Sequence, residues 1–557
     1  MFLGSLSLSL TMIGSGRLYD FGMGFWGPNG HDGIWHLGLM NQVVKKIPPD
    51  NPVFAGEELH NYHWGFDFLA GWLAKILPIS IFDVYFRLIP IFFAFLIGFL
   101  SFWFGKLNSG KFWVGFWFAF LNFFAGSFGW LVTLFREGKI GGESLFWSMQ
   151  SISTLINPPY GLSLIILLTG FIIWVYKRQA GRWYEGVLLG FLFGILAGIK
   201  IYAGILAGLS LFSFWLIKKL KFKATPFDFW AWVTTGLVSL VILFLFGIFA
   251  NNPGLIFQPF WFSHSLVESI DKLYLPKIAV LRMNLAANFL SWKLPFLIFL
   301  EFFLLIIFLV GNMGTRVFGL LTIVKKIVKR EMDDLNILLL LFLFFSLLFP
   351  LLFIQKGTAW NTIQFFYYFL FLANFYFALF LASLTESKSL KKKLFLAVLL
   401  LFTLPTTFST ARGYLGKTSP ATIPYYELEG LRFLKKQPEG IVLTFPYDAF
   451  KKTGVEPPMP LYIYESTAYV SALTEKITFL EDEMNLEITN YPWRERKKET
   501  QLFFNSQDRI WARGFLLNNG IDYIYLVNDQ QLSLSPENLA LKMIFNNDQV
   551  RIYQVLK

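Results

Sequence analysis

The sequence predicts an α-helical polytopic membrane protein with a C-terminal extracytoplasmic α/β domain. Three observations support this fold class. Hydrophobic residues make up 55% of the 557 positions. Charged residues make up only 15%, against about 25% in a soluble chain. After residue 411 the composition becomes that of an ordinary soluble domain. Because so few charges cannot coat a soluble surface, a water-soluble enzyme, a disordered chain and a nucleic-acid-binding module are excluded.

Apolar runs long enough to cross a bilayer as helices recur along the first 410 residues, and they suggest about 11 transmembrane helices. The first run has no basic residue before it, which fits neither a signal peptide nor a full span and is compatible with a chain that has lost its true start. Two short runs meet at Gly198-Ile199-Lys200. The candidate spans are 1–16, 84–105, 112–135, 159–176, 186–199, 201–217, 229–250, 294–312, 335–355, 361–384 and 393–410.

The basic residues support the order of these spans. The net charge is +12, and in a membrane protein such an excess marks the cytoplasmic connections. Five clusters of Lys and Arg lie in alternate connections between the spans. All five fall on one side of the membrane only if 186–217 forms two helices. No Cys is present, so there is no disulfide framework. The clusters are Lys106 and Lys111; Lys177, Arg178 and Arg182; Lys218, Lys219, Lys221 and Lys223; Arg316, Lys325, Lys326, Lys329 and Arg330; and Lys388, Lys391, Lys392 and Lys393.

The opposite side receives the long connections 17–83, 136–158 and 251–293, together with everything after about residue 411. We therefore predict two domains, a transmembrane domain at 1–410 and a soluble extracytoplasmic α/β domain at 411–557. Within the second domain, hydrophobic runs and turn signals predict strands and helices. The strands are 441–445, 523–527 and 550–555, and the helices are 494–504 and 509–518.

The outer segment 17–83 holds most of the chemistry-bearing side chains. Four of the five histidines lie there with several carboxylates. If 32–46 is an amphipathic helix at the membrane surface, Asp32 and His36 share one face. His60 and His63 also share a face if their stretch is helical. The candidate site residues of this segment are His31, Asp32, His36, Glu57, Glu58, His60 and His63.

Three interpretations of this segment stay open. A carboxylate near the membrane surface can act as general base on a hydroxyl acceptor. Alternatively, imidazole and carboxylate groups can hold a divalent cation such as zinc or manganese, although the histidine spacing follows no established zinc motif. The third interpretation is an interfacial helix whose polar residues merely face water. The metal candidates are Asp32, His36, His60 and His63.

This arrangement resembles the GT-C glycosyltransferase superfamily, whose members include polyprenol-phosphate-sugar-dependent transferases. The stretch Gly30-His31-Asp32-Gly33-Ile34-Trp35-His36 sits where that family places its catalytic acidic motif. The segment 194–203 is similar to its Gly/Ala-rich span ending in Lys. The family motif usually has two acidic residues, whereas here His31 precedes Asp32. The resemblance therefore implies Asp32 alone as catalytic base, with His31 as its partner or as a substrate contact.

If the resemblance holds, a sugar passes with inversion from a lipid-phosphate-linked donor to an acceptor hydroxyl. The anionic leaving group needs cationic stabilisation. Lys200, followed by Tyr202, is the first candidate, because a lysine in an apolar setting is costly, although it can also snorkel to the headgroups. Each of the further candidates for substrate binding also has a purely structural explanation, such as snorkelling, a local ion pair or an interfacial anchor. These candidates are Arg87, Arg282, Trp360, Asn361 and Gln364.

The resemblance implies a multi-pass protein of a prokaryotic plasma membrane. Its partners would be membrane lipids, the lipid-linked sugar donor and a glycan, lipid or protein acceptor, with no nucleic acid and with a divalent cation as an open cofactor. Two alternatives from other classes stand beside it. One is a transporter or flippase of lipid-linked glycans, and the other is a non-catalytic membrane scaffold. Concentration of the polar groups on one face favours the enzyme.

Overall fold

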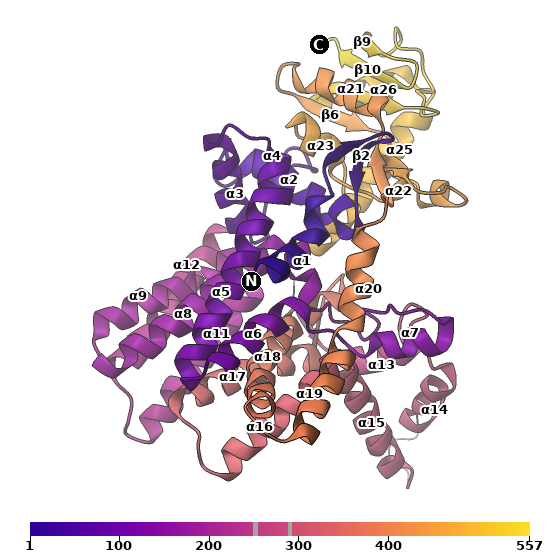
Figure 1. Ribbon diagram of the computed structural model, residues 1–557. Helices are drawn as coiled ribbons and strands as arrows, with labels where there is room; N and C mark the ends of the chain where they lie inside the picture. The colour runs from indigo at the N-terminus through magenta and orange to yellow at the C-terminus, as the bar shows by residue number, and fades with distance from the viewer. Residues whose placement is uncertain (249–253, 288–291) are drawn as a thin grey trace. The chain divides into compact units, whose positions relative to one another are not determined.

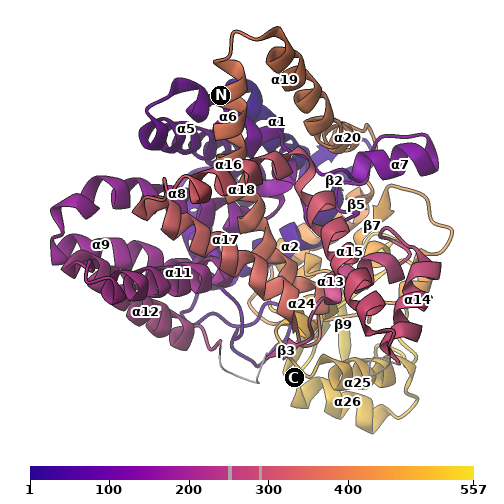
Figure 2. The same cartoon turned by 90° about the horizontal axis from the view of Figure 1, so that it is seen from below.

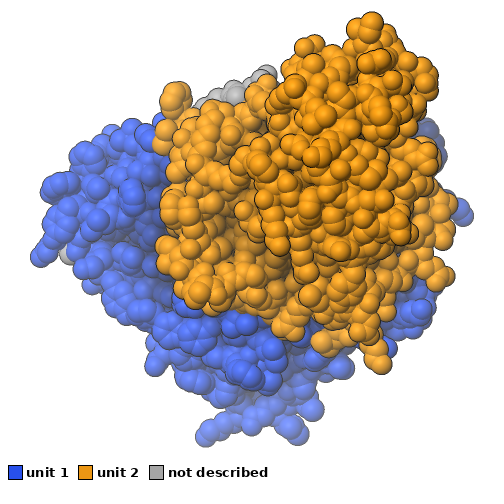
Figure 3. Space-filling view, turned by 90° about the horizontal axis from the view of Figure 1, so that it is seen from above, with its two compact units in different colours: residues 1–11, 91–243, 254–413 blue, residues 12–90, 244–253, 414–557 orange. Residues whose placement is uncertain are grey.

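The computed structural model describes residues 1–248, 254–287 and 292–557 (Figure 1). Parts of the predicted span 229–250 and of the predicted segment 251–293 lie outside the described residues. The chain divides into two compact units, which Figure 3 colours separately. Unit 1 comprises residues 1–11, 91–243 and 254–413, and unit 2 comprises residues 12–90, 244–253 and 414–557.

Unit 1 consists mainly of apolar helices. In the described chain, 8 helices are long and apolar enough to cross a membrane, or up to 9 if the bent pair α6 and α7 forms one span. Two shorter apolar helices, Phe2–Ile13 and Trp183–Ile199, coincide with the remaining predicted spans. The helices are α1 Phe2–Ile13, α5 Ile89–Ser109, α6 Phe112–Phe124, α7 Gly129–Glu137, α8 Pro158–Lys177, α9 Trp183–Gly194, α10 Leu196–Ile199, α11 Ile201–Leu220, α12 Pro226–Leu245, α13 Trp261–Glu268, α14 Pro276–Ala286, α15 Leu294–Met313, α16 Val317–Val328, α17 Asp334–Leu352, α18 Ile363–Thr385, α19 Leu390–Thr403 and α20 Pro405–Tyr414.

The break predicted within 186–217 is present. Lys200 has an extended backbone (φ −154°, ψ 104°) between α10 and α11. Ion pairs also join helix ends that the charge pattern assigns to one side. Arg178 and Lys218 both contact Asp334 at the start of α17, and Lys111 pairs with Glu386. Several of the predicted basic clusters therefore lie at a common end of unit 1.

The centre of unit 1 is α18, which is 83% buried over its apolar window and packs against α6, α16 and α17. Figure 2 shows α16, α17 and α18 side by side. Arg316, at the bend between α15 and α16, is 1% exposed. Its guanidinium donates to Asn374 Oδ1 at 2.8 Å and to Gln150 Oε1 at 2.9 Å. Arg316, which the charge pattern groups with the cytoplasmic basic residues, is instead buried, and its charge is enclosed by polar acceptors inside unit 1.

Unit 2 combines the first long connection with the C-terminal part of the chain. Its sheet β1-β2-β5-β7 draws strands from both parts, and β2 pairs antiparallel with β5 through Met23 and Ile423. A second sheet has the order β6-β8-β10-β9. Unit 2 holds β1 Arg17–Tyr19, β2 Gly22–Phe25, α2 Asp32–Val43, α3 Gly65–Ile76, α4 Ile81–Asp83, β5 Ala421–Ile423, α21 Tyr425–Lys435, β6 Ile441–Thr444, β7 Met459–Pro460, α22 Leu461–Tyr464, α23 Tyr469–Thr474, α24 Glu483–Ile488, α25 Trp493–Asn505, α26 Arg509–Asn518, β8 Ile521–Val527, β9 Leu541–Asn546 and β10 Val550–Val555.

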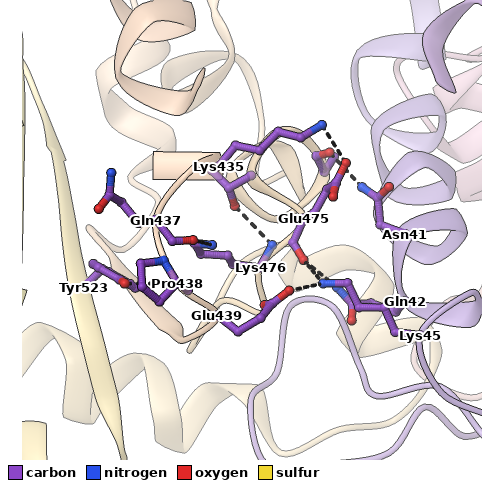
Figure 4. A network of polar contacts seen from close by, with 12 residues as sticks. Asn41, Gln42, Lys45, Lys435, Gln437, Pro438, Glu439, Glu475, Lys476 and Tyr523 are labelled. Atoms are coloured by element: carbon purple, nitrogen blue, oxygen red, sulfur yellow. Dashed lines mark hydrogen bonds and ion pairs between the residues drawn. The ribbon is translucent and has the colours of Figure 1, made fainter. Parts of the chain in front are cut away.

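Helix α2 lies inside unit 2, with every residue after Asp32 buried. The expectation of an amphipathic helix at the membrane surface is therefore wrong, because α2 packs between α3 and α23. Polar groups at its far end bind the C-terminal part of the chain. Asn41 Nδ2 donates to the Ala472 carbonyl at 2.9 Å, and Lys45 Nζ donates to Glu439 at 2.9 Å (Figure 4). The first outer segment is thus an internal component of the C-terminal fold.

The pairing of β2 with β5 gives a stability prediction. Gly22 has φ +119°, and a Cβ there would lie 2.3 Å from the Ile423 carbonyl oxygen. Gly56 also has positive φ, but a Cβ there meets nothing within 4 Å. We expect Gly56→Ala to cost about 1–3 kcal/mol in backbone strain and Gly22→Ala to cost more, because the strands must also separate. Calorimetric melting in detergent measures both, and equal Tm losses would contradict the pairing.

Candidate active site

The candidate site is built around an Asp–His–Asp chain of polar contacts at the start of α2. His31 Nδ1 lies 2.8 Å from Asp32 Oδ1, and His31 Nε2 lies 3.1 Å from Asp482 Oδ1. His31 and Asp482 are buried, whereas the Asp32 side chain is 49% exposed. The chain of contacts therefore has two buried members and one carboxylate that solvent and a substrate can reach.

Asp482 is held in place by its own helix. It caps α24, where its carboxylate accepts from the Asn485 backbone N–H at 3.1 Å and from Asn485 Nδ2 at 2.8 Å. Its backbone is left-handed, with φ +49°. These bonds direct the carboxylate toward His31, and they satisfy a group that is costly to bury alone.

Electrostatics favour a charged His31. Burial by itself would lower the pKa of the His31 imidazole, but the carboxylates of Asp482 and Asp32 raise that pKa well above its ordinary value. Both ring nitrogens then act as donors to carboxylates. A nearby carboxyl group, Glu465, has its pKa raised by burial, and it also interacts with the charges of His31 and Asp32. The site therefore gathers three carboxyl groups around one imidazolium.

His36 takes a different partner from Asp32, although the two are four residues apart. Its Nδ1 lies 2.6 Å from Asp67 Oδ1, and both side chains are buried. The imidazole stacks on Tyr85 with ring centroids 5.7 Å apart and meets the edge of Phe66 at 5.9 Å. This contact joins α2 to α3. The geometry places His36 in the interior of unit 2 rather than on a surface shared with Asp32.

The second histidine pair lies in a loop, and so the prediction of a shared helical face is wrong. His60 stacks on Tyr491 with centroids 4.2 Å apart, and His63 stacks on Tyr62 at 4.8 Å. The neighbouring acidic residues are exposed, and Glu58 pairs with Lys46 at 2.8 Å. The His60 and His63 rings are thus packed on tyrosines, and Glu57 and Glu58 lie on the surface of the loop.

The metal alternative does not gain support from this geometry. Among the described residues, no group of three or more His, Asp or Glu side chains is arranged to hold a metal ion. The histidine beside Asp32 has both ring nitrogens on carboxylates, whereas a metal-bound imidazole must offer a lone pair. His36 contacts Asp67 through its Nδ1 and lies in the interior. The candidate set Asp32, His36, His60 and His63 therefore does not form one centre.

The predicted cations occupy distinct settings. Arg87, in unit 2, pairs with Asp83 and donates to the Ser15 carbonyl at 2.7 Å, which ties α4 to the end of α1. Arg282, in unit 1, pairs with Glu268 at 2.7 Å. Both arginines are engaged by carboxylates of their own unit. The Lys200 ammonium lies over the Tyr202 ring, 5.6 Å from the centroid, and the residue is 3% exposed.

The polar turn before α18 also lies in unit 1. Asn361 Nδ2 donates to Gln355 Oε1 at 2.7 Å, and Gln364 donates to Asn361. Trp360 is 41% exposed. The structure thus brings Asn361 and Gln364 into one hydrogen-bonded turn and leaves the Trp360 ring accessible. Lys200 and Tyr202 lie in the same unit.

The sequence did not indicate two residues of the candidate site, Asp482 and Glu465. Asp482 is separated from His31 by 451 positions, and the acidic run around it has the composition of a solvated loop. Glu465 lies in an unremarkable stretch. A weak signal exists for Asp482, because an Asp three residues before Asn485 fits a helix N-cap. That signal predicts a helix start but no partner for His31.

No family model matches the sequence, and no curated protein matches it. The structure resembles the oligosaccharyltransferase of Archaeoglobus fulgidus. Its complex with an inhibitory peptide and a dolichol-phosphate gives a TM-score of 0.52 at 12% identity, covering 94% of this chain and 68% of that chain. This structural similarity identifies the fold of the chain. The chain shares the fold of this archaeal oligosaccharyltransferase.

Two further structures of the same archaeal enzyme give the same result. The form tethered to an acceptor peptide gives a TM-score of 0.50 at 12% identity, with 94% of this chain and 68% of that chain covered. The complex with Zn and sulfate gives 0.50 at 12%, covering 94% and 67%. The GT-C resemblance predicted from 30–36 and 194–203 is thus confirmed at the level of the polytopic membrane fold.

The His31 chain of contacts predicts a pH-dependent stability. A histidine whose folded pKa is raised stabilises the fold fully below its unfolded pKa of about 6.5, and the contribution is lost as pH rises through the folded pKa. We expect the wild-type Tm to fall as pH rises from about 6.5 upward and the profile of His31→Gln to be flatter.

His60 provides a matched control, because burial lowers the pKa of its imidazole instead. His60→Gln should keep the alkaline loss of stability that the wild type shows. If wild type and His31→Gln lose Tm in parallel across the alkaline range, the charged His31 between Asp32 and Asp482 is contradicted.

Proposed function

We propose that the protein is a membrane glycosyltransferase that moves a sugar from a lipid-phosphate-linked donor to an acceptor hydroxyl. Asp32 is its general base, and the site faces the outside of a prokaryotic plasma membrane, as does the 411–557 domain. The GT-C fold supports this proposal, since the similar archaeal enzyme is described with a dolichol-phosphate and with an acceptor peptide. The basic clusters at one end of unit 1 support the orientation.

The proposal rests on the Asp32 carboxylate, which is exposed but is held in place by the buried side chains of His31 and Asp482. A catalytic base must reach its proton at hydrogen-bonding distance, and it must not move away when the substrate binds. Asp32 meets the first requirement by its 49% exposure and the second through His31, which Asp482 holds from behind. The N-terminus of α2 adds a favourable helix dipole for the carboxylate.

The proposed sugar transfer is a single displacement at the anomeric carbon, with Asp32 as the base. The acceptor oxygen forms a bond to the anomeric carbon while the bond from that carbon to the donor phosphate oxygen breaks. The lipid phosphate leaves with the bonding electrons, and the acceptor proton passes to the Asp32 carboxylate. Attack opposite to the leaving group inverts the anomeric centre, through an oxocarbenium-like state. His31 carries positive charge beside Asp32 and fixes its orientation throughout.

The leaving phosphate needs a cation, and Lys200 is our candidate. It is buried at the helix break between α10 and α11, where a lysine is costly unless it has a role or a partner. Arg87 and Arg282 are less suitable, because carboxylates of their own unit already engage them. Trp360, Asn361 and Gln364 in unit 1 are further candidates for donor contacts, through ring stacking and amide hydrogen bonds.

Sugar transfer in proteoliposomes tests the proposal. We expect Asp32→Asn to lower kcat about 10²- to 10⁴-fold with polyprenyl-phosphate-linked sugars, because the amide cannot accept the acceptor proton. KM should change little. Asp20→Asn removes an exposed carboxylate of the same segment and should transfer sugar at the wild-type rate.

Equal rates for Asp32→Asn and wild type would contradict the general base. The same liposomes distinguish the transporter alternative. Movement of the donor lipid across the bilayer, with no sugar transferred to any acceptor, would replace the enzyme by a flippase.

A further inference from the structure

Unit 1 contains two cavities on the helices α16, α17 and α18, which Figure 2 shows side by side. The first has a volume of about 200 Å³, and its lining is apolar apart from Arg316 and Tyr376. We call it the apolar cavity. The second has a volume of about 300 Å³, and charged and amide side chains, among them Lys111, Lys326 and Asn336, contribute to its lining. We call it the polar cavity.

The two cavities are neighbours. Tyr376 lines the apolar cavity and Asn336 lines the polar cavity, and Tyr376 Oη donates to Asn336 Oδ1 at 3.3 Å. Helical spacing gives the same adjacency. Ile323 and Lys326 on α16 are three residues apart, and Asn336 and Leu340 on α17 are four apart, so each pair shares a helix face. One ligand can therefore extend from the apolar cavity into the polar one.

The apolar cavity opens on the outer surface of unit 1. Leu320 and Phe344 line it and are 41% and 54% exposed. Because α16 and α17 belong to helices that are long and apolar enough to cross a membrane, this surface faces hydrocarbon rather than water. An apolar cavity of about 150 Å³ is large enough to hold benzene. The apolar cavity therefore has room for several methylene groups of a lipid chain.

The polar cavity offers an ammonium group that the protein does not neutralise. Lys111 is paired with Glu386 outside the lining. Lys326 also lines the cavity, and no ion pair of its ammonium is present among the described residues. The lining carboxylate, Asp333, caps α17 and accepts from the Asn336 backbone N–H at 2.8 Å and from Asn336 Nδ2 at 2.6 Å. An external anion is therefore the natural partner of Lys326.

The surroundings of the polar cavity strengthen this preference for an anion. Lys325, Lys329 and Arg330 adjoin Lys326 in the sequence. The Asp334 carboxylate is already engaged by Arg178 and Lys218. Basic side chains at the ends of membrane spans attract anionic lipid headgroups. The polar cavity thus lies where the charge of unit 1 favours such a headgroup.

We propose that the two cavities together bind one anionic phospholipid. Its phosphate lies in the polar cavity against Lys326 and Lys111, and part of one acyl chain fills the apolar cavity. A volume of about 300 Å³ is at the lower end of small-molecule sites, which suits a phosphoglycerol headgroup. The charged part and the apolar part of the site match the two parts of such a lipid. This inference does not depend on sugar transfer.

This lipid is distinct from the proposed sugar donor. Ser383 lines the polar cavity close to the end of α18, whereas Gln364, a candidate donor contact, lies at the start of α18. A helix rises about 1.5 Å per residue, which places these two residues about 30 Å apart along its axis. The phospholipid site and the candidate donor contacts of the Asn361 turn therefore lie at opposite ends of α18.

Native mass spectrometry of the full-length protein, freed of lipid in detergent, tests the proposal. The probes are dioleoylphosphatidylglycerol, dioleoylphosphatidylcholine, which has the same chains and no net charge, and glycerol 3-phosphate, which has no chains. We expect one phosphatidylglycerol to bind at least about 5-fold more tightly than phosphatidylcholine, because each lysine near an anionic headgroup contributes about that factor. Glycerol 3-phosphate should bind far more weakly, since it leaves the apolar cavity empty.

Two lysine variants locate the headgroup. Lys326→Gln should weaken phosphatidylglycerol binding about 5-fold and leave phosphatidylcholine binding unchanged. Without lipid it should keep the wild-type Tm, because the Lys326 ammonium has no ion pair in the described chain. Lys325→Gln is the matched control, since Lys325 is exposed and does not line the polar cavity. It should bind phosphatidylglycerol like wild type.

A third variant locates the chain. Ile323 is half-buried and lines the apolar cavity, so Ile323→Phe places a ring there and should weaken binding of both phospholipids. The inference fails if phosphatidylcholine binds as tightly as phosphatidylglycerol, or if the two lysine variants lose the same affinity. It also fails if glycerol 3-phosphate binds as tightly as phosphatidylglycerol, which would indicate a site for a free phosphate ester, or if Ile323→Phe binds both lipids like wild type.

Discussion

The ion chain from Asp32 through His31 to Asp482 is the interaction on which the organisation of unit 2 depends. It joins residues 451 positions apart at a place where His31 is almost inaccessible. A buried imidazolium is unfavourable by itself, and it persists because carboxylates occupy both sides. Removing either carboxylate would leave a charge without compensation. The contact therefore requires the first outer segment and the C-terminal part of the chain to fold together.

Other contacts in unit 2 are consistent with this joint folding. Strand β2 completes a sheet with β5, and α2 is buried along its length. The contact of His36 Nδ1 with Asp67 Oδ1 then fixes α3 to α2. Most of the histidines that cluster in the sequence thus serve packing, whereas the Asp32 carboxylate beside the buried His31 stays accessible. We propose Asp32 as the reactive carboxylate because its partners His31 and Asp482 are buried.

Local patterns predicted much of the fold. The apolar runs correspond to helices because hydrophobic length alone specifies a span, and β10 and α26 coincide with the predicted 550–555 and 509–518. The sheet that includes β2 and β5 could not be predicted, because its strands are short and pair over long separations. Arg316 shows the limit of the charge pattern, since burial among distant polar acceptors leaves no local signal. The contact between Asp482 and His31 could not be predicted either, because residues so far apart in the chain leave no local signal.

We propose that Asp482 acts on the sugar-transfer reaction only through Asp32. The most direct measurement is the coupling between Asp32→Asn and Asp482→Asn in kcat for sugar transfer, with correct folding checked by circular dichroism. We predict that Asp482→Asn alone lowers kcat and that adding it to Asp32→Asn lowers kcat no further, because the base it orients is already absent. Losses that multiply in the double variant would contradict the claim.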